Sequence, residues 1–235
     1  MKSIITTIAQ TLFALFLYAL GVLILGLAIF PGALLIYFVF IQTAGDAIAS
    51  RVLMLCFSLV TAYFLHGLVL IFLVGVFRIL FRLKLREAEY PMASLGSAKW
   101  FITNALQTLV SITFMDFILL TPFASLFYRF MGAKLGKNVQ INSKFCADLS
   151  LLEIGDGAVI GGHATVIGHL FEHNKLILKK VKIGRRAVVG LNSIIMPGAE
   201  IGDGALIAAG AVVPKDAKIA PGSVYFGIVS QKRPE

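Results

Sequence analysis

Charged residues are scarce in this chain. Only 14% of its 235 residues are charged, whereas 58% are hydrophobic, and the mean hydropathy is +0.90. These values exclude an ordinary soluble domain and indicate a membrane protein. The apolar excess lies in residues 1–130, and the rest of the chain has ordinary contents of glycine, lysine and aspartate. The sequence therefore predicts a membrane part followed by a part of different construction.

Cysteine and acidic residues are also few. The two cysteines, Cys56 and Cys146, lie far apart and match neither a disulfide framework nor a zinc-binding spacing, so we expect a reducing compartment and no metal. Lys and Arg number 21 against 12 Asp and Glu, which gives a formal net charge of +9. A basic excess suits nucleic acid, anionic lipid or an anionic cofactor. No basic stripe interleaved with aromatic residues occurs, so we expect no nucleic-acid partner.

Two apolar runs near the start are long enough to cross a bilayer. Residues 8–30 carry no charge and would extend about 35 Å as a helix. After a Pro31-Gly32 step, residues 33–41 are expected to extend that helix beyond a kink. Residues 52–77 form the second run, which is followed by four basic residues, Arg78, Arg82, Lys84 and Arg86. The positive-inside rule places that basic end in the cytoplasm, so we expect a multi-pass protein of the inner (cytoplasmic) membrane.

Polar residues interrupt the apolar segments at two places. His66 lies near the middle of the second run, where an ionisable group is either functional or a neutral imidazole that hydrogen-bonds a neighbouring helix. In the third apolar segment, residues 99–130, a polar stripe at helical spacing contains Asn104, Gln107, Thr108 and Ser111. Because basic residues follow this segment, we expect an interfacial or re-entrant helix whose stripe lines the approach from the bilayer. A third span is the alternative.

A six-residue repeat organises the C-terminal part. Every sixth residue from position 183 is β-branched and aliphatic: Ile183, Val189, Ile195, Ile201, Ile207, Val213 and Ile219. A small or turn-compatible residue follows six of these seven. Neither the period of a strand nor that of a helix fits, so the segment must be an array. Each unit makes one strand and one turn, three units make a coil, and stacked coils bury one aliphatic residue per unit.

The same frame begins earlier and is interrupted once. Its earlier members are Leu135 and Ile141 and, after a slip of one residue, Ile154, Ile160 and Val166. The interval from Val166 to Ile183 is 17 residues, which is not a multiple of six. We expect its excess, residues 168–175, to be a loop or irregular coil. Insertions in a regular solenoid are where function usually lies.

The repeat resembles the left-handed parallel β-helix of hexapeptide acyltransferases. The handedness is implied by this resemblance, since the period does not specify it. The fold class that we expect is a membrane α-helical region plus an all-β left-handed parallel β-helix. The expected domains are 1–98, a helix pair with a basic cytoplasmic loop; 99–132, the interfacial or re-entrant helix with a connector; and 133–235, the repeat domain.

Four short elements make the resemblance more specific. They are Ala147-Asp148-Leu149, Ile154-Gly155-Asp156, His169-Leu170-Phe171-Glu172 and Val181-Lys182-Ile183-Gly184. In this order they resemble the C-terminal membrane region of ε-poly-lysine synthetases and their relatives, where acyltransferase-like domains alternate with pairs of transmembrane helices. At the tail, Phe226-Gly227-Ile228-Val229 replaces the Gly-Asn-Pro-Ala-like turn of many acyltransferases of this class. The 235 residues contain no adenylation or carrier domain, so peptide-forming chemistry is not carried over.

The resemblance implies an acyltransferase that uses a thioester donor, acyl-CoA and above all acetyl-CoA, on a hydroxyl or amine acceptor. It assigns His169 as the general base, a role that suits a group with a pKa near neutral. Glu172 or Asp148 would orient the imidazole. The predicted donor-binding residues are Gly190, Ala208, Ala209 and Gly210 for the pantetheine and Lys215 for a phosphate. The family also implies a homotrimer with active sites between subunits.

The membrane anchor and the histidines leave further alternatives open. Because an anchor is unnecessary for a soluble acceptor, we expect a membrane lipid or a lipid-linked or amphipathic acceptor at the cytoplasmic face. The donor is alternatively an aminoacyl thioester on a carrier protein that belongs to a peptide synthetase. A zinc site of the γ-carbonic anhydrase type would use His163, His169 and His173. A trimeric membrane scaffold without catalysis is the non-enzymatic alternative.

Overall fold

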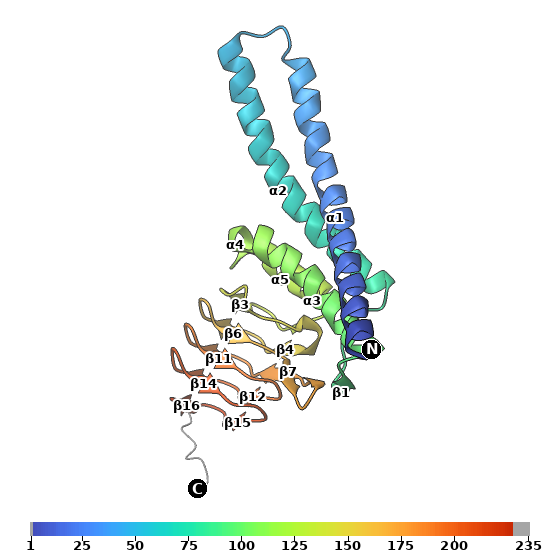
Figure 1. The fold of residues 1–235 in the computed structure, drawn as a ribbon. Helices are drawn as coiled ribbons and strands as arrows, with labels where there is room; N and C mark the ends of the chain where they lie inside the picture. The colour runs from blue at the N-terminus through green and yellow to red at the C-terminus, as the bar shows by residue number, and fades with distance from the viewer. Residues whose placement is uncertain (1, 228–235) are drawn as a thin grey trace.

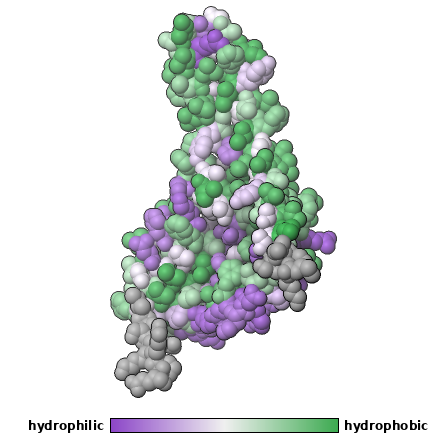
Figure 2. Space-filling view, in the orientation of Figure 1, coloured by the Kyte–Doolittle hydropathy of each residue, from purple (hydrophilic) through white to green (hydrophobic). Residues whose placement is uncertain are grey.

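The molecule consists of a long helix pair that rises from a stack of short strands (Figure 1). The computed structural model describes residues 2–227, with side chains described from residue 7 onward. The pair comprises α1 (Lys2–Gln42) and α2 (Ile48–Leu80), joined by a short turn at the far end. By length and composition, α1 from Thr7 and the whole of α2 could each cross a membrane. Hydrophobic residues cover most of their surface, and hydrophilic residues gather around the strands (Figure 2).

Helix α1 is continuous through Pro31, which confirms that residues 33–41 extend the first helix. Small residues bring the two helices together at this level. A Cβ atom at Gly32 would lie only 2.9 Å from Ala62 Cβ, so glycine permits the close approach. Such small-residue contacts are typical of helices that pack within a bilayer.

The third apolar segment breaks into α3 (Leu95–Thr113), α4 (Met115–Ile118) and α5 (Pro122–Phe130). These helices lie between the long pair and the strands (Figure 1). None of the three is among the helices of residues 7–227 that are long and apolar enough to span a membrane. The Ser94 hydroxyl caps α3 by accepting from the Ser97 amide at 3.2 Å. The Thr121 hydroxyl caps α5, which has proline in its first turn.

The predicted polar stripe on α3 is divided between two environments. Gln107 is buried, and its Nε2 donates to the Cys146 carbonyl oxygen at 2.6 Å. Thr108 is exposed on the same helix. The stripe is therefore not one open face toward the bilayer, because α3 lies across the first coil and that coil covers Gln107.

Three parallel sheets form the sides of the coil. The first contains β2 (Lys134–Leu135), β4 (Leu152–Ile154), β9 (Val181–Ile183), β12 (Glu200–Ile201) and β15 (Lys218–Ile219). The second contains β3 (Gln140–Ile141), β5 (Val159–Ile160), β10 (Val188–Val189), β13 (Leu206–Ile207) and β16 (Val224–Tyr225). The third contains β6 (Thr165–Val166), β11 (Ile194–Ile195) and β14 (Val212–Val213). A 3₁₀ turn, η1 (Leu149–Leu151), precedes β4.

The register of these sheets confirms the six-residue frame. Ile183 pairs with Ile201, and Ile201 pairs with Ile219, so one coil takes 18 residues or three units. Ile154 pairs with Leu135 across 19 residues, as the predicted slip of one residue requires. The inward residues are almost completely buried except in the last coil, where Ile219 and Tyr225 are partly buried, whereas their outward neighbours are exposed or half-buried. The strands repeat at this period because each offers only one side chain to the narrow interior.

The interruption of the frame is a β-hairpin, which corrects the expectation of a loop or irregular coil. Strand β7 (His169–Glu172) pairs antiparallel with β8 (Lys175–Leu178), and β1 (Ala88–Pro91) pairs with the other edge of β8. The two turn residues, His173 and Asn174, have φ of 48° and 61°, as tight hairpin turns require. The segment is ordered because β1, from the connection between α2 and α3, covers an edge that would otherwise lack partners.

The phase of the repeat predicts that substitutions at neighbouring residues change stability by very different amounts. Ile183 is 3% exposed inside the coil, whereas the Lys182 side chain is 51% exposed on its outer face. Ile183→Ala should lower the free energy of unfolding by about 2–5 kcal/mol, because it leaves a cavity. Lys182→Ala removes only an exposed ion pair, worth about 0–1 kcal/mol. Denaturant unfolding of the two purified variants measures the difference, and equal losses would contradict this register.

Candidate active site

A buried carboxylate holds the histidine of the hairpin. Asp148 Oδ2 lies 2.6 Å from His169 Nδ1, and the side chain of Asp148 is 1% exposed. The same oxygen accepts from the Gly168 amide at 2.9 Å, and Oδ1 accepts from Trp100 Nε1 at 2.6 Å. An ionised carboxylate only accepts, so the hydrogen on His169 is assigned to Nδ1. This leaves Nε2 as the acceptor nitrogen of the imidazole.

Aromatic rings enclose the imidazole on two sides. The ring centroids of Trp100 and His169 lie 4.7 Å apart, and those of His169 and Phe171 lie 5.8 Å apart. Trp100 meets Phe171 edge to face at 5.3 Å. The His169 side chain keeps 21% of its surface exposed, so a substrate can reach it. The rings shield the Asp148–His169 hydrogen bond from water, which strengthens it.

Three separate segments build this site. Asp148 lies just before η1 with φ of 54°, a left-handed conformation that aspartate tolerates. His169 opens β7, and Trp100 projects from the buried face of α3. Trp100 is a site residue that the sequence did not predict. The one usable signal was that it is the chain's single tryptophan, placed one turn before the polar stripe.

Glu172 and Lys215 pair with one another at the edge of the hairpin. Lys215 Nζ lies 2.7 and 2.9 Å from the two carboxylate oxygens of Glu172. The hydrogen bond from Lys215 holds the pKa of Glu172 below its usual value, and it raises the pKa of Lys215 in turn. Of the two carboxylates proposed to orient His169, the structure places Asp148 and not Glu172 on the imidazole. Lys215, proposed for a phosphate, has its charge balanced within the chain.

The other predicted donor-binding residues lie at a different corner of the coil. Gly190 follows β10, and Ala208, Ala209 and Gly210 follow β13, so both turns connect the second sheet to the third. His169 instead follows β6, on the connection from the third sheet to the first. A Cβ at Gly190 would lie 2.6 Å from the Ala209 nitrogen, so tight stacking already requires glycine there. One chain therefore does not bring these residues to His169.

The geometry also bears on the remaining histidines and cysteines. Within residues 2–227, no three His, Cys, Asp or Glu side chains are placed to hold a metal ion, so His163, His169 and His173 do not form the grouping that a zinc site needs. Burial raises the pKa of the Cys146 thiol to about 12, which keeps it protonated and a poor nucleophile. His66 Nδ1 is buried on α2 and has no hydrogen-bond partner in the described part of the chain.

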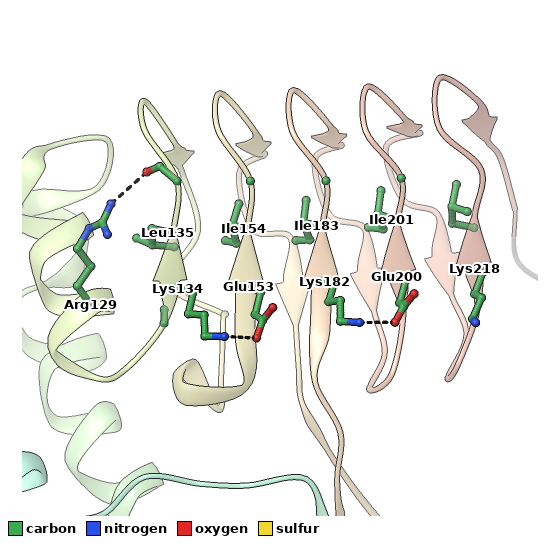
Figure 3. A pocket seen from close by; sticks show the side chains of 16 residues that line it. Arg129, Lys134, Leu135, Glu153, Ile154, Lys182, Ile183, Glu200, Ile201 and Lys218 are labelled. Atoms are coloured by element: carbon green, nitrogen blue, oxygen red, sulfur yellow. Dashed lines mark hydrogen bonds and ion pairs between the residues drawn. The ribbon is translucent and has the colours of Figure 1, made fainter.

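A broad groove on the outer face of the first sheet is distinct from this site. It has a volume of about 820 Å³, and His169 is not among its lining residues. Its outward side chains alternate in charge along the stack of strands (Figure 3). Lys134 pairs with Glu153 at 2.8 Å, and Lys182 pairs with Glu200 at 2.7 Å. These two pairs balance four of the groove's six charged residues, and the other two, Arg129 and Lys218, form no ion pair among residues 7–227.

Comparisons with known proteins agree with this fold. Residues 180–215 match the family model described as the hexapeptide repeat of succinyl-transferase. A delta-poly-L-ornithine synthetase from Acinetobacter baumannii (strain AB307-0294) is 24% identical over 152 residues. That match covers 61% of this chain and 11% of the synthetase, so the chain spans only about a tenth of that relative's length.

Two solved acetyltransferases are similar in structure. A maltose O-acetyltransferase from Clostridium difficile 630 is 23% identical with a TM-score of 0.47, over 60% of this chain and 88% of that one. A galactoside acetyltransferase, solved in complex with coenzyme A, is 21% identical with a TM-score of 0.41, over 64% and 84% of the two chains. The family match, with the register above, confirms the resemblance of the C-terminal part to hexapeptide-repeat proteins.

The hydrogen bonds of Asp148 predict a defined imidazole tautomer. Asp148→Asn replaces one carboxylate oxygen with an NH₂ group, which cannot accept a hydrogen bond. If the NH₂ faces Trp100, the indole N–H loses its acceptor. If it faces Gly168 and His169, the hydrogens on their nitrogens lose theirs. We expect a loss of about 1–3 kcal/mol of stability and a shift of His169 toward the Nε2-protonated form. ¹⁵N NMR of the histidine rings measures the tautomer. Asp216→Asn, at an exposed ion pair with Lys179, is the control and should leave it unchanged.

Proposed function

We propose that this chain, a hexapeptide-repeat protein, is a membrane-anchored acyltransferase. It transfers an acyl group from a thioester donor, acyl-CoA with acetyl-CoA first among candidates, to a hydroxyl or amine acceptor. The observation that carries the proposal is the Asp148–His169 pair, held on a hairpin that interrupts an otherwise regular coil. A histidine with one nitrogen fixed by a buried carboxylate and the other open to solvent suits a general base.

The chemistry follows from the two nitrogens of His169. The oxygen or nitrogen of the acceptor attacks the thioester carbonyl carbon. Nε2 of His169 takes the proton from that oxygen or nitrogen at the same time. The imidazolium that results is stabilised by the Asp148 carboxylate at Nδ1. When the tetrahedral intermediate collapses, the carbon–sulfur bond breaks and the proton on Nε2 passes to the departing thiolate. Trp100 acts as a positioning residue, since its indole N–H holds Asp148 in place.

A homotrimer would bring the predicted donor-binding residues of one copy close to His169 of another. The predicted donor residues Gly190 and Ala208 lie at another corner of the coil from His169, so a donor site that includes both needs a neighbouring copy. The outward side chains favour such contact, because the second and third sheets carry exposed apolar residues at Val188, Ile194, Leu206 and Val224. The first sheet carries charged side chains instead, most of them in ion pairs. We therefore propose that donor and acceptor meet in the groove between two copies.

The helix pair supports a membrane location for the reaction. Both long helices begin or end beside the repeat domain, so a bilayer around them leaves that domain on one side (Figure 1). The basic end of α2 favours the cytoplasm for that side. We propose a multi-pass protein of the inner membrane that acts on a lipid-linked or amphipathic acceptor.

A second donor class is favoured by one observation. The delta-poly-L-ornithine synthetase that matches 61% of this chain is named for making a peptide polymer. An aminoacyl thioester on a carrier protein would undergo the same attack at its carbonyl carbon and give an amide with an amine acceptor. His169 would keep its role, and only the partner that presents the thioester would differ.

Removal of the proposed base tests the function. His169→Ala should reduce transfer of radiolabelled acetyl groups from acetyl-CoA into membrane material by about 10²–10⁴-fold, because general-base catalysis is lost. His173→Ala, in the turn of the same hairpin, is the matched control and should retain activity. Unchanged transfer by His169→Ala would overturn the assignment.

The donor is tested by ligand stabilisation of the detergent-purified protein. Acetyl-CoA should raise the thermal midpoint of both the parent protein and His169→Ala, since a base is not needed to hold the donor. If acetyl-CoA stabilises neither, the carrier-bound thioester becomes the donor to test.

The trimer proposal is tested at the apolar outer face. Leu206 is 40% exposed on β13, and a charge there would be buried against a second copy. Leu206→Glu should dissociate the assembly, since an unpaired buried charge is strongly unfavourable. Lys218→Glu, outward on the first sheet, is the control and should leave it intact. Light scattering after size exclusion measures the mass, and a trimeric Leu206→Glu variant would exclude this interface.

A further inference from the structure

A cavity at the base of the helix pair gathers positive charge. It has a volume of about 660 Å³ and lies between the last turn of α2, the connection after it and the first turns of α3. Half of its ten lining residues are cationic and none is acidic. The five cations are Arg78, Arg82, Lys84, Arg86 and Lys99.

No counter-charge among the residues that the structure describes balances these five cations. None of them forms an ion pair with a carboxylate of residues 7–227. The nearest carboxylates in sequence are engaged elsewhere, Glu87 with Lys180 and Glu89 with Lys175. Arg78 donates from Nη1 to the Phe130 carbonyl oxygen, and its Nε is buried without a partner. Like charges that converge on one cavity favour an anion inside it.

The phosphate of a lipid fits this cavity better than a soluble anion because an apolar path enters it. Phe72, Val76 and Ile79 are 57%, 42% and 61% exposed on α2. Their spacing puts them on one face of the helix, and Ile79 also lines the cavity. Acyl chains that follow this face would bring a headgroup to the cations. These cations lie where a membrane-spanning α2 leaves the bilayer.

We propose that this cavity binds the phosphate headgroup of an anionic membrane lipid. The first turns of α3 add to the attraction, because Gly96 lines the cavity and a helix N-terminus favours negative charge. The site adjoins the active site through two residues. Leu178 lines the cavity and pairs in register with His169, and Lys99 precedes Trp100. The proposal stands independently of acyl transfer, and a bound lipid would hold α3 and the hairpin at the membrane boundary.

The test compares two variants that lose the same charge. K84Q/R86Q/K99Q removes three cavity cations and leaves Arg78, which supports the Phe130 carbonyl, in place. K137Q/R186Q/K218Q removes three cations from the repeat domain, outside the cavity. Native mass spectrometry of the full chain in detergent, with dioleoyl phosphatidate or dioleoyl phosphatidylcholine added, measures bound lipid.

The parent protein and the repeat-domain variant should bind phosphatidate equally and prefer it to phosphatidylcholine. The cavity variant should bind phosphatidate at least about tenfold more weakly, since each cation near an anionic headgroup adds to the affinity. Equal weakening in both variants would indicate diffuse attraction and overturn the proposal. So would retention of phosphatidate by the cavity variant.

Soluble anions form the second arm of the experiment. Thermal stabilisation by inorganic phosphate or by coenzyme A should be the same in the parent protein and the cavity variant. If the cavity variant loses stabilisation by either anion but not the binding of phosphatidate, the cavity is a soluble-phosphate site and the lipid assignment is wrong. His169→Ala should bind phosphatidate like the parent protein, which separates a failure of the lipid site from a failure of acyl transfer.

Discussion

The carboxylate of Asp148 is the group on which the parts of this protein depend. A buried carboxylate is costly unless hydrogen bonds replace its water. Here the replacements come from α3 through Trp100, from the backbone at Gly168, and from the hairpin through His169. Because each donor belongs to a different element or strand connection, their common acceptor sets the helix, the coil and the hairpin in one arrangement. The tautomer of the imidazole follows from the same hydrogen bonds.

The regular coils constrain their side chains for stability, whereas the hairpin that interrupts them carries the candidate catalytic histidine. Regular coils need one aliphatic residue per unit and small residues where neighbouring turns stack closely, which leaves little freedom for functional side chains. The hairpin is not bound by this requirement, because β1, from the connection between α2 and α3, pairs with its edge. That pairing also joins the connection after α2 to the candidate active site. The helical part therefore takes part in the site, since the connection after α2 supplies a strand and α3 supplies the tryptophan.

Charged residues are arranged differently in the repeat domain and at the end of α2. In the repeat domain, carboxylates pair with lysines or arginines on neighbouring coils, as Glu200 does with Lys182 and Asp203 with Arg185. Among residues 7–227, the cations at the end of α2 form no ion pair with a carboxylate, since the nearby Glu87 and Glu89 pair with Lys180 and Lys175. The net charge of +9 thus includes a local excess around the end of α2. In the membrane topology that we propose, these cations would face the anionic surface of the cytoplasmic leaflet.

The sequence by itself determined the two long helices and the phase of the coil, because both follow from periodic apolar residues that act locally and repeatedly. Ile183, Ile201 and Ile219 stack as their spacing requires. The tertiary structure alone decided which carboxylate meets His169. Glu172 is nearer in sequence, but it lies on the same hairpin and pairs with Lys215. Asp148 is 21 residues away and arrives through the stacking of coils. Trp100 comes from a helix earlier in the chain, 48 residues before Asp148, and no local pattern encodes such contacts.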